Sequence, residues 1–93
     1  MIVSFKDKRL LRVLQGKRAK GFPSQLITRT QALLEAMDFS ETVETLRFPP
    51  SNRLEQLKGD RAGQHSIRVN KQWRICFRWT DEGAEDVEFV DYH

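Results

Sequence analysis

The chain has 93 residues, 39% of them hydrophobic, and carries 16 Lys and Arg against 13 Asp and Glu, a net charge of +3. This length predicts a single domain, residues 1–93, and the hydrophobic content suffices for one core, which excludes a disordered chain. No apolar run approaches the roughly 18 residues of a membrane span, and a single cysteine, Cys76, excludes an internal disulfide.

The first predicted elements are a short strand and a helix. Residues 2–5 form a β-prone run, and we expect a first strand there. In residues 6–15 the apolar side chains are spaced as on one face of a helix, and Gly16 follows as a stop signal. The start of the chain lacks the apolar stretch of a signal peptide, so we expect a cytoplasmic protein without membrane contact.

A second helix is predicted after a turn at residues 21–24, with Ser24 as its cap. Apolar side chains then recur at intervals of three and four residues, which is typical of the buried stripe of a helix ending near Asp38. Residues 41–46 are expected to add a short helical turn before Pro49 and Pro50 interrupt the chain.

The second half of the chain predicts strands, because the hydrophobic period changes to two. We expect a short strand at 53–57, a glycine-containing loop at 58–63, and strands at 64–70, 73–79 and 86–92, the last two joined by a hairpin loop at 80–84. Successive alternating runs with short loops indicate an antiparallel sheet. With two helices before it, the fold class is α+β, with the helices packed on one face of the sheet and Trp73 and Trp79 in the core.

The opposite face of the sheet is expected to carry Arg68, Arg74 and Arg78 side by side. Like charges on neighbouring strands cost up to about 1 kcal/mol per directly opposed pair, so a face built only for stability would include carboxylates. The pattern therefore predicts a face that binds phosphate groups. If Glu88 on the last strand supplies a compensating carboxylate, the face is instead an ordinary charge-balanced surface.

Charge is also segregated along the chain. Residues 1–30 carry eight basic residues and one acidic residue, and residues 51–80 carry seven basic and two acidic residues. Residues 31–50 carry one basic and four acidic residues, and residues 81–93 carry six acidic residues and no Lys or Arg. Such segregation either creates a field that attracts polyanions to one face, or places acidic and basic segments beside one another in the fold.

Several sequence blocks together resemble a known family. The blocks are residues 54–63 (LEQLKGDRAG), residues 66–70 (SIRVN), residues 73–75 with Phe77, the opening MIVSFK and the closing VDYH. They span nearly the whole chain, and their combination is similar to the HigB-type branch of the RelE/ParE toxin superfamily. The resemblance implies a RelE-like fold, a small twisted antiparallel sheet with two N-terminal helices.

The resemblance also implies a function. Members of this branch are toxins of type II toxin–antitoxin systems that cut mRNA in the ribosomal A site without a metal or another cofactor. A cognate antitoxin with a helix-turn-helix domain, similar to HigA, holds them inactive and carries any contact with operator DNA. We therefore expect the ribosome, its mRNA and this antitoxin as partners.

The expected reaction begins with attack of the RNA 2′-hydroxyl on the adjacent phosphate, and an acid must protonate the leaving 5′-oxygen. His93 suits the acid, since the C-terminal carboxylate beside it favours the charged imidazole. Asp91, Tyr92 and His93 match the functional C-terminus of the family, and Tyr92 is able to stack on a base. We expect Lys58 to hold the phosphate as a point charge. We expect four further residues to bind RNA phosphates: Arg61, Arg68, Arg74 and Arg78.

Glu55 departs from the family pattern, because many members carry His-Pro where this chain has Glu55-Gln56. Glu55 is a candidate base, but its carboxylate repels the phosphate, so cleavage is expected to be slower than in the family. Two alternatives remain open: a ParE-like toxin that inhibits DNA gyrase, and a ribosome- or RNA-binding growth inhibitor with weak or lost nuclease activity. We expect His65 to be structural.

Overall fold

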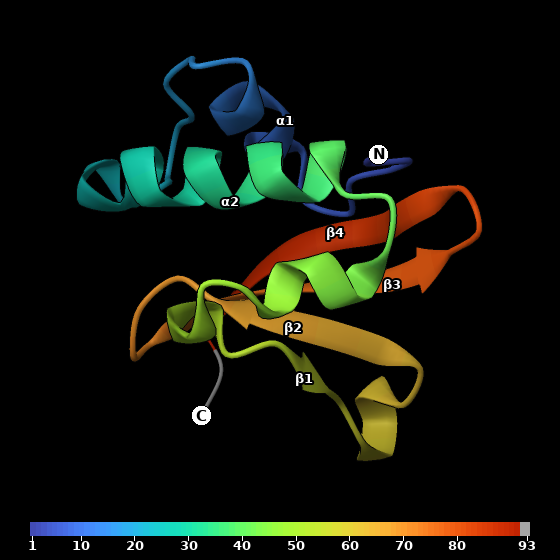
Figure 1. Ribbon diagram of the computed structural model, residues 1–93. Helices are drawn as coiled ribbons and strands as arrows, with labels where there is room; N and C mark the ends of the chain where they lie inside the picture. Colours follow the sequence, from blue (N-terminus) through green and yellow to red (C-terminus); the bar gives the residue numbers. More distant parts are fainter. Residues whose placement is uncertain (92–93) are drawn as a thin grey trace.

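A computed structural model describes residues 1–91 as an antiparallel sheet covered by two helices (Figure 1). The strands are β1 (Glu55–Gln56), β2 (Gln64–Arg68), β3 (Trp73–Thr80) and β4 (Gly83–Asp91), and they lie in the order β1-β2-β3-β4. Every neighbouring pair is antiparallel. The α+β class predicted from the change in hydrophobic period is therefore confirmed.

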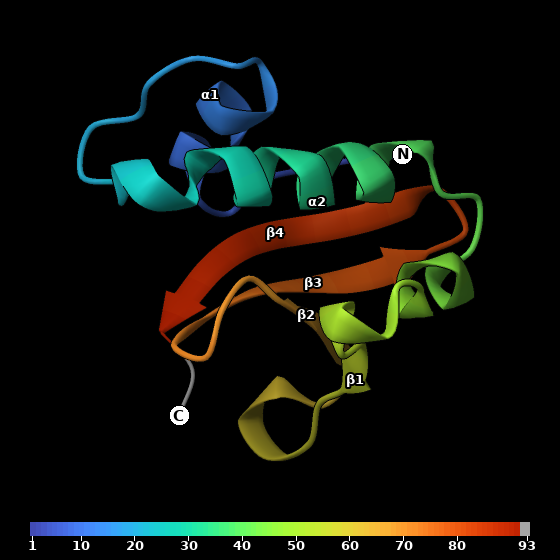
Figure 2. The ribbon, with the colours of Figure 1, turned by 60° about the vertical axis from the view of Figure 1, so that its left-hand side comes forward.

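The helices α1 (Lys8–Leu14) and α2 (Ile27–Phe39) lie on the same side of β4 (Figure 2). The side chain of Asp7 caps α1 by accepting a hydrogen bond from the backbone of Arg9 at 3.1 Å. The expected cap at Ser24 is wrong, because Ser24 is the first residue of a short 3₁₀ turn, η1 (Ser24–Leu26), that leads into α2. No helix within residues 1–91 has the length and apolar character needed to cross a membrane.

The N-terminal segment lies along the outer edge of β4, where it forms two isolated parallel bridges, Ile2 with Ala84 and Phe5 with Val87. The predicted strand at residues 2–5 is therefore only partly correct. Backbone hydrogen bonds such as Val3 N to Ala84 O, at 2.7 Å, attach the segment to β4. This segment covers part of an edge that would otherwise present unpaired backbone groups.

The core lies between the helices and the sheet. Phe77, Ile75 and Leu34 are completely buried within one hydrophobic cluster. Full burial of such a side chain stabilises the fold by about 1.5–3 kcal/mol. Trp73 and Trp79 pack against the same cluster, as predicted, and Trp73 stacks on a neighbouring aromatic ring.

The loops differ from the prediction in detail. The strand expected at 53–57 is reduced to β1, because Arg53 has a left-handed backbone with φ of +45° that ends the turn η3 (Pro50–Asn52). The helical turn expected at 41–46 is the 3₁₀ turn η2 (Val43–Arg47). Inside the loop at 58–63 lies a further 3₁₀ turn, η4 (Gly59–Arg61). The hairpin loop expected at 80–84 is shorter than predicted, because only two residues separate the end of β3 from the start of β4.

Candidate functional site

The strand register gathers the predicted arginines on the sheet face that points away from the core. Arg68 of β2 lies opposite Arg74 of β3, and Arg78 of β3 lies opposite Gln64 of β2. Alternate residues of the same strands, such as Ile75, point into the core. We call the outward face the site face; because β1 pairs with β2, Glu55 belongs to it as well.

Arg74 is the most constrained cation of the site face, with only 8% of its surface exposed. Its Nε donates a hydrogen bond to Ser66 Oγ at 2.8 Å, and its Nη2 donates one to the backbone oxygen of Arg53 at 2.6 Å. Glu55 Oε1 lies 4.0 Å from Nη2. The guanidinium is therefore held in one position, and its charge is only loosely balanced by the exposed Glu55 carboxylate.

A second cluster on the site face is centred on Glu88 of β4. Arg61 Nη2 donates a hydrogen bond to Glu88 Oε1 at 3.0 Å, and Arg61 Nη1 donates one to Gln64 Oε1 at 3.0 Å. Lys6 Nζ lies 3.2 Å from Glu88 Oε2. Glu88 thus supplies the carboxylate anticipated for a charge-balanced surface, but it pairs with Arg61 and Lys6 rather than with the strand arginines.

A small cavity opens beside Arg74 at the end of the sheet where β2 turns into β3. It has a volume of about 270 Å³, and its lining residues are Arg53, Glu55, Arg68, Asn70, Lys71 and Arg74. Four of these six side chains are cationic, so the cavity attracts an anion such as a phosphate group.

Arg53, Asn70 and Lys71 also line this cavity, and they were not among the site residues predicted from the sequence. A signal for Asn70 was present in the short connection that it opens, since Asn commonly bonds to the backbone two residues later. Its Oδ1 accepts hydrogen bonds from Gln72 N at 2.9 Å and Trp73 N at 2.7 Å. No sequence signal marked Arg53, whose place depends on its left-handed backbone.

Arg78 and Lys58, the two remaining predicted cations, are exposed. Arg78 lies beside Gly63, where an added Cβ would be 3.1 Å from Arg78 Nη1. Lys58 directly precedes η4, the turn that contains Arg61. The predicted cations are therefore spread over the strands and the η4 loop instead of converging on one point.

Asp91 is the only member of the predicted C-terminal set among the described residues; Tyr92 and His93 lie outside them. Asp91 pairs with Trp73 at the end of β4, and its Oδ2 accepts a hydrogen bond from Gln72 Nε2 at 3.1 Å. Asp91 therefore lies next to the β2–β3 turn, at the same end of the sheet as the cavity.

Burial shifts the pKa values of two further titratable side chains, His65 and Cys76. His65 lies on the core side of β2 with its ring stacked on Phe77 at 5.9 Å, and burial lowers the pKa of its imidazole. This geometry agrees with a structural role. Burial raises the pKa of the Cys76 thiol on the site face, so Cys76 stays protonated near neutral pH and does not provide a reactive thiolate.

Comparisons of the sequence with known proteins point to one family, and a solved structure shares the fold. The family model described as the RelE-like toxin of type II toxin–antitoxin system HigB matches residues 3–93. Toxin HigB-1 of Vibrio cholerae is 42% identical over 94 residues, which cover all of this chain and 98% of the relative. Endoribonuclease HigB of Proteus vulgaris is 36% identical over the full length of both chains. The solved YoeB-YefM complex from Staphylococcus aureus contains a chain with the same fold, at a TM-score of 0.63 and 17% identity, covering all of this chain and 95% of that one.

Proposed function

Since this chain belongs to the RelE-like HigB toxins of type II toxin–antitoxin systems, we propose that it arrests growth by cleaving mRNA in the ribosomal A site. The name of the Proteus vulgaris relative, an endoribonuclease, supports cleavage of RNA. The observation that carries the proposal is the cationic cavity beside the fixed guanidinium of Arg74. Such a guanidinium, already oriented before RNA arrives, stabilises the charge that develops on a phosphate during its transfer.

The reaction that we propose needs no metal. The 2′-oxygen forms a bond to phosphorus, the bond from phosphorus to the 5′-oxygen breaks, and His93 donates a proton to that oxygen. Arg74 and Arg68 hold the phosphate in the cavity, while Lys58 contributes a further positive charge. Glu55 accepts the proton of the 2′-hydroxyl. Its exposed carboxylate lies 4.0 Å from Arg74 and repels the phosphate, which supports slow cleavage.

The other C-terminal and site-face residues bind the RNA rather than exchange protons. In our proposal Tyr92 stacks on a base of the codon, and Asp91 orients the C-terminus through its contact with Gln72. Arg61 and Arg78 bind RNA phosphates along the site face, and these contacts set the direction in which the RNA strand runs across it. Their contacts are expected to depend on salt, as phosphate contacts do.

The partners follow from this activity. We propose that the full chain acts as one domain on translating ribosomes in the cytoplasm. A cognate antitoxin with a helix-turn-helix domain, similar to HigA, neutralises it and alone contacts operator DNA. Membership of a toxin–antitoxin family supports the antitoxin.

Purified ribosomes programmed with a defined mRNA test the nuclease. We expect the wild type to cut the A-site codon. The variants His93→Gln and Tyr92→Phe should lose most of the cleavage, whereas Lys17→Gln, an exposed residue outside the site, should behave like the wild type.

Growth assays with the same variants distinguish the alternatives. Growth arrest by the wild type with intact A-site mRNA would contradict the proposal. DNA damage in such arrested cells would identify a gyrase inhibitor instead. Arrest that survives both C-terminal substitutions would indicate inhibition by RNA binding alone.

A further inference from the structure

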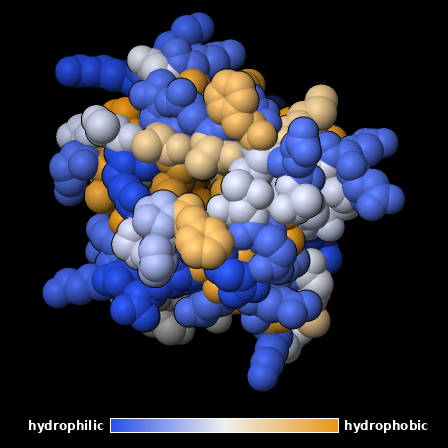
Figure 3. Space-filling model, viewed as in Figure 1, coloured by the Kyte–Doolittle hydropathy of each residue, from blue (hydrophilic) through white to orange (hydrophobic). Residues whose placement is uncertain are grey.

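A groove that is apolar at one end and acidic at the other lies on the helix side of the molecule, away from the site face. Two hollows of about 360 and 430 Å³ share Phe39, Ser40 and Glu41 and so form one continuous groove between the end of α2, η2 and the β3–β4 hairpin. Figure 3 shows apolar side chains gathered at the surface between α2 and η2, where the surface is hollowed. None of the residues that line the cationic cavity lines this groove.

Two exposed phenylalanines line the groove. Phe39, at the end of α2, is 84% exposed, and Phe48, directly after η2, is 73% exposed. Both line the larger hollow, whose floor includes the buried Leu46. Aromatic residues next to a pocket commonly provide most of the binding energy of a protein interface. Neither ring belongs to the hydrophobic core, so packing within this chain does not explain why both positions are apolar.

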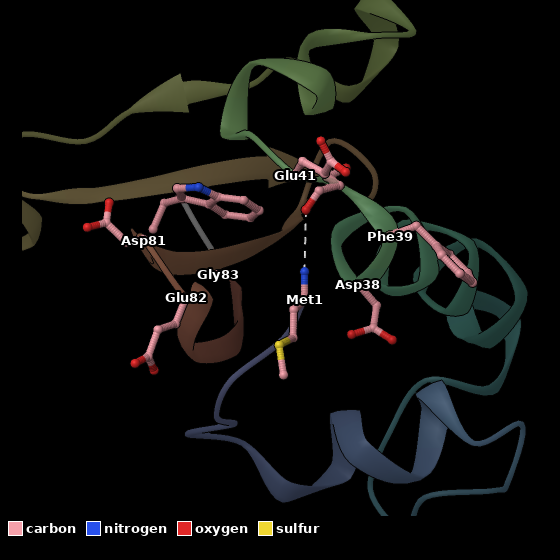
Figure 4. Close-up of a pocket in the computed structure, with 9 residues that line it drawn as sticks. Met1, Asp38, Phe39, Glu41, Asp81, Glu82 and Gly83 are labelled. Carbon is pink, nitrogen blue, oxygen red and sulfur yellow. Dashed lines mark hydrogen bonds between the residues drawn. The ribbon is translucent and has the colours of Figure 1, made fainter.

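The smaller hollow is acidic. Its lining includes four carboxylates, those of Asp38, Glu41, Asp81 and Glu82. In Figure 4, Asp81 and Glu82 lie on the opposite side of the hollow from Asp38. The Met1 ammonium group, which also lines this hollow, donates its hydrogen bonds to backbone oxygens of α2 and Ser40. Within residues 1–91, Glu41, Asp81 and Glu82 form no ion pair, and no three carboxylates converge as a metal site requires.

Resting on the proposed function, we propose that this acidic groove binds a segment of the antitoxin that combines an apolar side chain with Lys or Arg. The apolar side chain enters the larger hollow between Phe39 and Phe48. The cationic side chains lie over Glu41 and the hairpin carboxylates. Charge complementarity selects this occupant, because the rim repels the phosphates of a nucleic acid.

Two sets of substitutions test the groove, each with a control at exposed residues outside it. The first is Phe39→Ser with Phe48→Ser, controlled by Leu11→Ser, a leucine of α1 that is 43% exposed. The second neutralises the rim with Glu41→Gln, Asp81→Asn and Glu82→Gln. Its control is Glu35→Gln with Asp86→Asn, two exposed acidic residues outside the groove.

The binding partner in the test is the purified protein encoded by the reading frame next to this gene, and its affinity is measured by calorimetry. We expect each groove variant to bind at least 10-fold more weakly than the wild type, and the controls to bind within about twofold. The rim variant should also lose part of the salt dependence of binding. Programmed ribosomes should be cut equally by all variants, because none lies on the site face.

Three results would overturn the inference: no binding by the wild type, unchanged affinity of both groove variants, or a wild-type dimer in sedimentation that the phenylalanine variant dissociates. The last would assign the groove to a second copy of this chain. Calorimetry does not require nuclease activity, so failure of the proposed cleavage would leave this test intact. Equal thermal unfolding of the variants excludes loss of folding as the cause.

Discussion

Arg61 and Glu88 form an ion pair at 3.0 Å that joins the η4 turn to β4, across 27 residues of sequence. Glu88 also lies 3.2 Å from Lys6, so one carboxylate holds two cations on the site face. Its side chain is 15% exposed and that of Arg61 is 30% exposed, so this pair is less screened by water than a surface ion pair. Glu88 therefore orients Arg61 and at the same time reduces the positive potential of the face.

Replacing Glu88 by Gln separates these two effects. The neutral side chain removes one negative charge, so affinity for single-stranded RNA should increase at low salt. Arg61 keeps its bond to Gln64 but loses its ion pair with Glu88, so the cleavage rate on programmed ribosomes should fall about 10-fold or more. Glu85→Gln, on the same strand opposite Arg78, is the control. An unchanged cleavage rate would show that Arg61 does not depend on Glu88.

Arg74→Lys tests the constrained guanidinium. A lysine amine has no planar pair of donors, so it is unable to reproduce the bonds to Ser66 and to the backbone of Arg53. We expect a loss of about 1.5–3 kcal/mol in the free energy of unfolding, measured by urea denaturation, together with reduced cleavage. Arg78→Lys, an exposed control, should change stability by less than about 0.5 kcal/mol. Equal stability of the two variants would contradict the buried position of Arg74.

Gly83→Ala tests the attachment of the N-terminal segment. Gly83 has φ of +130°, and an added Cβ would overlap the carbonyl group of Met1, which accepts a hydrogen bond from Ala84. We expect destabilisation of about 1–3 kcal/mol, seen as a lower Tm. Gly59→Ala is the matched control, because its φ of +66° is strained for alanine while no atom lies within 4 Å of the added Cβ. It should therefore cost only about 1 kcal/mol.

The folded protein should lose stability in mild acid because of His65. Burial lowers the pKa of its imidazole in the folded state below the usual value of 6.5, so the unfolded chain binds more protons in this range. The stabilisation that neutral His65 contributes is complete above about pH 6.5, and it is lost as the pH falls through the lowered pKa of its imidazole. Urea midpoints at pH 7.5 and 5.5 should differ for the wild type. They should differ less for His65→Phe, which keeps a ring on Phe77, whereas His93→Gln should retain the difference.

The sequence predicted the secondary structure well wherever a hydrophobic period extended over several turns or strands. The alternation in residues 64–70 and 73–79 indicated which side chains face the core, because successive side chains of a strand point to opposite faces. The same rule assigned Arg68, Arg74 and Arg78 to one outward face, as the register confirms. Short elements were less predictable, because the strand expected at 53–57 ends at the backbone conformation of Arg53.

Local patterns in the chain were enough to predict the family, the α+β class and the outward arginines of β2 and β3. These depend on residue identity and on periodicity, which are local properties of the chain. Three relationships became visible in the folded chain alone: Arg74 is buried and bonded to the backbone, Glu88 pairs with Arg61, and Phe39 and Phe48 line one groove. Each of these relationships joins segments that are distant in sequence or separated by a turn. Their geometry follows from the packing of the whole fold, which no local pattern records.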